Sequence, residues 1–179
     1  MKIKYTTISL FLILFLSSCE KWFWQHDKLH LEKRNYNGTE LRIDGYYFQE
    51  YGGEEKYLDI VFFYRNGVVL DVASTKESIS ENEINFRLES CCTNIKEHRW
   101  NWGVFNIDSN VIKYERWYPY DLVDKAFVNE GYILNDTTFI ITKRYRIKRD
   151  VEKELRILND TFHFKELSPK PDSTNNFIK

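Results

Sequence analysis

Hydrophobic and polar residues alternate along most of this chain, and the alternation predicts short β-strands. Over residues 41–47 every second residue is apolar or glycine, which is typical of a strand with one face turned inward. Residues 57–64 are almost continuously apolar and aromatic, so they predict a strand covered on both faces. Asn66-Gly67 then favours the tight turn of a β-hairpin, with residues 68–73 as the returning strand.

The second half of the chain continues this pattern and predicts further strands. Pro119 is expected to end one of them, because proline cannot donate a hydrogen bond to a strand ladder. The pentapeptide Ile-Leu-Asn-Asp-Thr occurs at residues 133–137 and again at 157–161, and we interpret each Asn-Asp pair as a turn. The strands expected here are 100–107, 111–118, 126–134, 137–148 and 162–167.

One segment between the two strand series has a helical pattern. Ser80 and Glu83 match a capping box, and the apolar residues that follow have helical spacing, so we expect one helix over residues 81–97. Cys91 and Cys92 would lie on or beside its apolar stripe, which favours packing over reactivity. Free thiols, a bond between the two neighbours and an intermolecular disulfide all remain open for this pair.

Composition supports a β fold. Aromatic residues make up 17% of the chain, with 12 Tyr and 13 Phe, and such residues suit the half-buried surface of a sheet. Short antiparallel strands joined by tight turns remove their exposed edges by closing or by packing as a sandwich. We therefore predict a mainly β protein, an antiparallel barrel of about eight to nine strands with one inserted helix.

The beginning of the chain follows a different pattern, that of an export signal. Lys2 and Lys4 precede an apolar stretch at residues 8–16, and Leu-Ser-Ser-Cys ends it at Cys19. The stretch is too short for a spanning helix, which needs about 20 apolar residues. The arrangement resembles bacterial lipoprotein signals, which implies that residues 1–18 are removed and that Cys19 carries fatty acids as the first residue of the mature chain.

The mature chain has the size of one domain. We expect residues 19–40 to form an acylated tether with room for a short helix, 41–168 to form the barrel and 169–179 to form a C-terminal tail. The tail is expected to be ordered only where Phe177 and Ile178 find an apolar surface.

Two groups of residues in the tether have a chemistry of their own. Trp22, Phe23 and Trp24 follow the acylation site, so they either lie at the lipid headgroups or fold back onto the domain, and both readings stay open. His26 and His30 would share one face of a helix, as a metal-binding pair does. Because no third ligand lies nearby in the sequence, we expect no metal site.

Charge and motifs restrict the function further. The chain has 26 basic and 27 acidic residues, interspersed throughout, and loss of the signal would remove Lys2 and Lys4. Binding to nucleic acid needs clustered Lys and Arg, so we expect none. The sequence contains no motif for nucleophilic catalysis, zinc-dependent hydrolysis or phosphate binding, so we expect neither an enzyme nor a cofactor.

Three short motifs resemble a known group of proteins. They are Asp-Gly-Tyr-Tyr at residues 44–47, Trp-Gly-Val-Phe-Asn-Ile at 102–107 and Pro-Asp-Ser-Thr-Asn at 171–175. Together with the lipoprotein signal, they resemble uncharacterised lipocalin-like lipoproteins of the Bacteroidota, which implies a lipocalin-like barrel. The chain departs from the lipocalin pattern in having Gly-Tyr-Tyr in place of Gly-x-Trp and in the mid-chain position of the expected helix.

The sequence thus predicts a lipid-anchored protein of the cell envelope, at the outer membrane and facing the periplasm or the cell surface. Its expected partners are the membrane, through Cys19, and a small apolar ligand inside the barrel. The alternative is a barrel filled by its own side chains that binds an envelope protein or a glycan. Candidates for lining a ligand site are the aromatic residues Tyr47, Phe62, Tyr64, Trp102, Tyr114 and Trp117.

Overall fold

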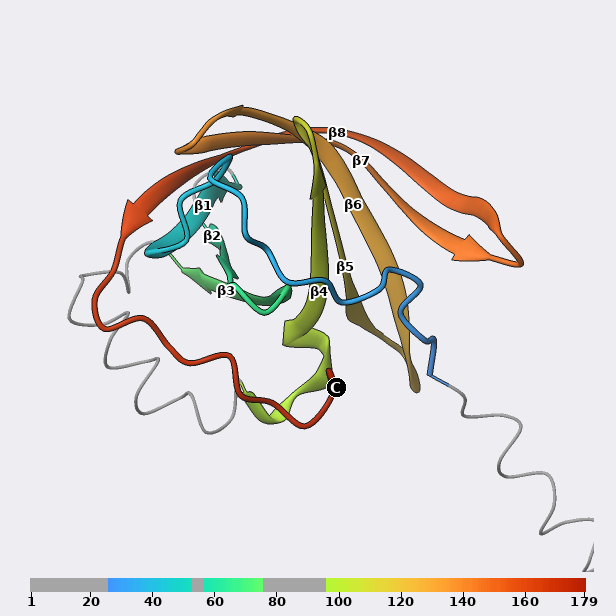
Figure 1. Ribbon diagram of the computed structural model, residues 1–179. Helices are drawn as coiled ribbons and strands as arrows, with labels where there is room; N and C mark the ends of the chain where they lie inside the picture. The colour runs from blue at the N-terminus through green and yellow to red at the C-terminus, as the bar shows by residue number, and fades with distance from the viewer. Residues whose placement is uncertain (1–25, 53–56, 76–95) are drawn as a thin grey trace, which may run out of the picture.

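The computed structural model describes residues 26–52, 57–75 and 96–179, which form a closed antiparallel β-barrel (Figure 1). Each strand pairs with the next, and β8 returns to pair with β1, so the sheet has no free end. The predicted antiparallel barrel is confirmed, with eight strands. The strands are β1 (Gly45–Tyr51), β2 (Tyr57–Phe63), β3 (Val68–Thr75), β4 (Trp102–Asp108), β5 (Val111–Tyr120), β6 (Val123–Asn135), β7 (Thr138–Lys148) and β8 (Val151–Glu166).

Among the described residues, helical structure is confined to residues 96–97 and to η2 (Arg99–Asn101), a single 3₁₀ turn that leads into β4. Most of the helix predicted for 81–97 lies outside the described residues, and so do Cys91 and Cys92. The same holds for Cys19 and for the aromatic residues predicted to follow it in the tether.

Several predicted strand ends differ from the structure, and two of the differences have a clear physical reason. The first strand begins at Gly45 and not at Leu41, because Leu41 belongs to a segment that closes one end of the barrel. Pro119 does not stop β5, which continues to Tyr120. Beyond Arg116 the ladder between β4 and β5 has ended, so Pro119 pairs only with β6, and its missing N–H lies on a free edge.

The repeated pentapeptide serves two different purposes. Asn135 forms the expected turn between β6 and β7, where its Oδ1 accepts a hydrogen bond from the Thr137 N–H at 2.9 Å. The second copy lies within β8, where Asp160 pairs with Ile141, so the turn predicted there is wrong. β8 stays paired with the long β7 through this stretch. The strand predicted at 162–167 is therefore the last part of β8 and not a separate strand.

One half of the barrel interior is filled by aromatic and aliphatic side chains, which we call the interior cluster. The Phe63 ring of β2 meets the rings of Phe105 at 4.8 Å, Tyr114 at 6.0 Å and Phe139 at 5.7 Å. These contacts join strands that are not neighbours in the sheet, so they cross the barrel. The fully buried members are Tyr36, Leu41, Tyr47, Val61, Phe63, Val69, Phe105, Ile112, Tyr114, Phe139, Ile141 and Phe162.

The segment before β1 seals this end of the barrel. Tyr36 and Leu41 are buried in the interior cluster, and the Leu41 N–H donates to the Tyr36 hydroxyl at 2.8 Å. Backbone hydrogen bonds join Tyr36 to Arg65 and Arg42 to Asp136, at two turns of the same end. Residues of the predicted tether are therefore part of the barrel structure.

A second set of buried side chains covers the outside of the first four strands, and we call it the outer cluster. The tail after β8 crosses this surface, as Figure 1 shows in red, and Phe177 and Ile178 pack there. The expectation that these two residues find an apolar surface is therefore confirmed. The buried members are Tyr46, Leu58, Ile60, Phe62, Tyr64, Val68, Leu70, Val72, Trp102 and Leu167.

Candidate functional site

The other half of the barrel interior carries charged side chains, and we call it the charged interior. Asp71 pairs with the interior residue Val61, and Arg116 lies two positions beyond the interior residue Tyr114. Asn129 pairs with Tyr114, and it also pairs with Arg144 of β7. Since side chains alternate between the two faces of a strand, the register turns these groups into the barrel.

An ion pair lies at the centre of the charged interior. Arg116 Nε and Asp71 Oδ2 are 2.7 Å apart, and the side chain of Asp71 is almost fully buried whereas that of Arg116 is partly exposed. Neither atom has a partner with hydrogen-bonding geometry. The two charges therefore attract each other, but both atoms lack a hydrogen bond. The Arg116 guanidinium also lies 3.8 Å from the centre of the Tyr118 ring, and that of Arg144 lies 4.9 Å from it.

A second carboxyl group, that of Asp59, lies within hydrogen-bonding distance of Asp71. Burial raises the pKa of Asp71 to about 8, although the charge of Arg116 opposes this shift. Burial also raises the pKa of Asp59, whose side chain hydrogen-bonds to that of Asp71. Such a bond needs a proton on one of the two carboxyls, so burial favours a singly protonated pair opposite Arg116.

The charged interior is more exposed to solvent than the interior cluster. Asp59, Arg116 and Tyr118 are half-buried although they face the inside of the barrel. At the end of the barrel nearest to these residues, which we call the mouth, the rings of Tyr51 and Tyr57 stack with their centres 5.7 Å apart. Burial raises the pKa of Tyr51, and the charges of Asp59 and Asp71 add to this effect, which places the ring near the carboxyl pair.

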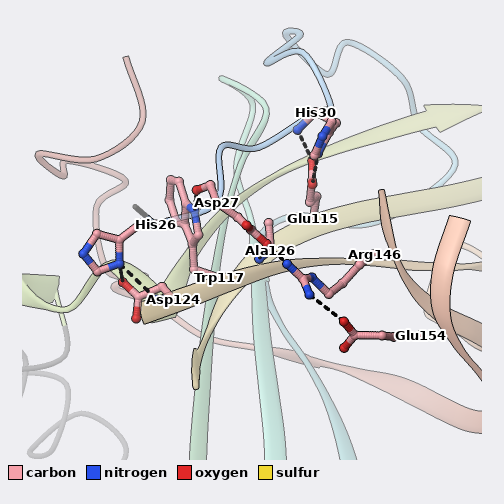
Figure 2. Close-up of polar contacts among 9 residues, drawn as sticks. All are labelled: His26, Asp27, His30, Glu115, Trp117, Asp124, Ala126, Arg146 and Glu154. Atoms are coloured by element: carbon pink, nitrogen blue, oxygen red, sulfur yellow. Dashed lines mark hydrogen bonds and ion pairs between the residues drawn. The ribbon is translucent and has the colours of Figure 1, made fainter. Parts of the chain in front are cut away.

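On the outside, the chain before β1 fills a seam between two strands (Figure 2). The ladder between β6 and β7 ends at Val128 and Tyr145, and each strand continues beyond that point without pairing to the other. Asp27 bridges the two strands there. Its Oδ2 accepts from the Ala126 N–H of β6 at 3.1 Å and from Arg146 Nη2 of β7 at 2.6 Å.

The two histidines of the N-terminal segment bind separate carboxylates on the same outer surface. His26 Nδ1 lies 3.0 Å from the Asp124 carboxylate, and His30 Nδ1 lies 3.1 Å from that of Glu115. Residues 26–30 have no helical turn, so the shared helical face predicted for the two histidines is wrong. Among the described residues, no group of three or more side chains could hold a metal ion.

The same segment borders a surface groove of about 690 Å³ beside β4 and β5. In the groove, the Arg99 guanidinium lies 5.0 Å from the Trp117 ring and 6.0 Å from the Phe177 ring. Its apolar lining comes from four separate parts of the chain, and its basic residues lie among them. The lining residues are His26, Asp27, Lys28, Leu29, Leu31, Lys33, Arg99, Val104, Trp117, Phe177, Ile178 and Lys179.

The six aromatic residues predicted to line a ligand site do not surround one cavity. Tyr47 and Tyr114 belong to the interior cluster, where contacts with other rings surround them. Trp117 faces the groove and donates from Nε1 to the Asp27 carbonyl at 2.6 Å. The other three belong to the outer cluster, namely Phe62, Tyr64 and Trp102.

Sequence reasoning missed the charged interior, although two of its residues have a recognisable signal. Asp59 and Asp71 are each a single acid within an otherwise mostly apolar strand, β2 and β3 respectively. An acid at a position that alternation turns toward the core needs a partner or a function. The sequence does not mark Arg116 and Arg144 in this way, because other charged residues lie close to both of them in the sequence.

Comparison with protein family models, curated proteins and solved structures found no match for this chain. In the part of the chain that the structure describes, no helix is long and apolar enough to cross a membrane. The fold and the site together define a closed eight-stranded barrel with one sealed, apolar half and one charged half.

Proposed function

We propose that the protein is a lipid-anchored envelope protein that binds a small polar ligand in the charged interior, without catalysing a reaction. The anchor is supported by the signal pattern that ends at Cys19. Binding is supported by one observation, the carboxyl pair of the partly exposed Asp59 and the buried Asp71 facing Arg116 inside a barrel.

The charges themselves favour binding over a purely structural role. Burying an ion pair removes both groups from water, and well-packed apolar side chains of similar volume are often as stabilising or more so. The interior cluster of this barrel shows such packing a short distance away. In the charged interior, two buried polar atoms lack hydrogen bonds, Asp71 Oδ2 and Arg116 Nε. A ligand that completes these hydrogen bonds explains the charged groups better than a structural role does.

The chemistry of the site favours a polar ligand over the apolar one expected from the sequence. The apolar half is occupied by its own aromatic rings, which meet across the barrel. The carboxyl pair offers acceptor oxygens and one proton, and the stacked Tyr51 and Tyr57 offer flat surfaces at the mouth. A ligand with hydroxyl or ammonium donors, such as a sugar, an amino sugar or an amino acid, fits these groups.

Calorimetry and thermal unfolding with three probe classes test the proposal. The probes are glucosamine, lysine and palmitate, added separately to the mature protein in detergent. We expect a polar probe to bind and to raise the melting temperature, and we expect Asp59→Asn to weaken this binding at least tenfold, a loss typical of a hydrogen bond to a charged group. Asp108→Asn, at an exposed position in β4, is the matched control and should bind as the wild type does.

Two results would contradict the proposal. Binding of palmitate alone would restore the apolar ligand predicted from the sequence. Failure of all three probes, with Asp59→Asn indistinguishable from the wild type in every assay, would favour the filled barrel that acts through its surface.

A further inference from the structure

We propose that the groove beside β4 and β5 is the surface by which the protein rests on an anionic membrane. The proposal relies on the lipid anchor proposed above, because it uses the distance between the groove and Cys19. It adds which face of the barrel meets the lipid and which lipid headgroups that face selects.

The first argument is the reach of the chain. His26 and Lys28 line the groove, and His26 follows Cys19 by seven residues. Since an extended chain spans at most about 3.6 Å per residue, the acylated sulfur lies within roughly 25 Å of His26. This limit holds for any path that the intervening residues take. A groove that begins at the end of so short a tether lies close to the bilayer whenever the anchor is inserted.

The second argument is charge. Lys28, Lys33, Arg99 and Lys179 line the groove, and no ion pair is assigned to any of them within the described residues. The single acidic side chain in the lining, Asp27, is already paired with Arg146. Lys28, Lys33 and Arg99 therefore give the groove unbalanced positive charge, on a chain whose acidic and basic residues are nearly equal in number. Anionic headgroups supply the matching charge, and they act only within about 8 Å at physiological salt.

The third argument is the apolar floor between the cations. Leu29, Leu31, Phe177 and Ile178 are only partly buried, and the Trp117 ring lies beneath Arg99. Lysines around aromatic and aliphatic side chains are the combination found on proteins that lie at the membrane interface. Because β4 and β5 belong to the side wall of the barrel, contact through this groove leaves the mouth near Tyr51 open to ligand.

Lysine footprinting on the anchored protein tests the proposal. The acylated full-length mature protein is reconstituted in vesicles of phosphatidylcholine, with or without phosphatidylglycerol, and its lysines are acetylated and quantified by mass spectrometry. Lys28, Lys33 and Lys179 should react roughly five-fold more slowly in the anionic vesicles, the factor expected for one cation at such a surface. Lys148 and Lys153, exposed on the β7–β8 hairpin, should react equally in both.

Matched variants connect the protection to the charges of the groove. In Lys28→Gln/Lys33→Gln, the remaining Lys179 should lose its protection in anionic vesicles. In the control Lys148→Gln/Lys153→Gln, which removes two exposed charges elsewhere, Lys179 should stay protected. All four substituted residues are exposed, so neither variant removes a buried contact.

The outcomes separate the groove from the anchor. Equal reaction of the groove lysines in neutral and anionic vesicles, with the protein still floating with the vesicles, overturns the docking surface and leaves the lipid anchor intact. Equal protection in both vesicles also overturns it, since apolar contact and not charge would then cover the groove. A protein that floats with neither vesicle overturns both the anchor and the docking surface.

Discussion

Replacing Asp71 by asparagine is expected to change how the stability of the protein depends on pH. The folded-state pKa of Asp71 is raised by burial to about 8, from an ordinary value of 3.8. Between these values the folded protein holds a proton that the unfolded chain has released. The stability linked to this proton is fully present below pH 3.8 and is lost as the pH rises toward 8.

The size of the effect follows from proton linkage. One proton held only in the folded state lowers the free energy of unfolding by about 1.4 kcal/mol for each unit of pH increase. From pH 5 to pH 7 the wild type therefore loses about 3 kcal/mol through this carboxyl. Asp71→Asn removes the proton exchange but keeps a hydrogen-bonding group of similar shape next to Asp59. Its stability relative to the wild type should rise by about 3 kcal/mol over this interval.

Urea unfolding followed by tryptophan fluorescence, at four values of pH from 5 to 8, measures this difference. Asp108→Asn, an exposed substitution in β4, is the control and should follow the wild-type profile. Parallel profiles of the wild type and Asp71→Asn would refute the reasoning, because they would show that the Asp71 carboxyl releases its proton equally in the folded and unfolded states. They would also remove the shared proton from the description of the charged interior.

Two further predictions concern the core and the anchor. Phe139→Ala should lower the free energy of unfolding by about 3–5 kcal/mol, because Phe139 is fully buried against the rings of Tyr47 and Phe162, whereas Ile157→Ala at an exposed position should change it by less than about 0.5 kcal/mol. Urea unfolding compares them, and a similar small effect of both would mean that the interior is not packed. Cys19→Ala should abolish incorporation of labelled palmitate and release of residues 1–18, as measured by intact mass, and unchanged mass and labelling would contradict the lipoprotein signal.

The local pattern of the sequence was sufficient for the hairpin of β2 and β3. Asn66-Gly67 indicated the turn, and Gly67 adopts a φ of 78°. A side chain at this position would also come within 2.1 Å of the Arg34 carbonyl, so glycine is required by the packing of the N-terminal segment as well. The strands on either side pair as predicted, from Phe63 with Val69 outward. Turn chemistry and strand propensity act over a few residues, and such features can be read from sequence.

Which face of a strand points into the barrel could not be read in the same way. Both faces of β2 are largely apolar, so alternation does not distinguish Phe62, which lies outside, from Phe63, which lies inside. The outer face is buried because the C-terminal tail covers it, with Phe177 more than a hundred residues along the chain. Contacts between residues far apart in the sequence determine which aromatic candidates lie inside the barrel and which lie outside it. Such contacts also bring Asp59, Asp71 and Arg116 together.

The seam at Asp27 gives the barrel a defined response to mechanical load. Tension from the lipid anchor proposed at Cys19 would reach His26 first, which is bonded to Asp124 of β6, and Asp27 next. Asp27 joins β6 through Ala126 and β7 through Arg146, at the point where those strands have ceased to pair with each other. The contacts of His26 and Asp27 with Asp124 are thus loaded first, and the bonds that join β6 to β7 at their unpaired ends are loaded next.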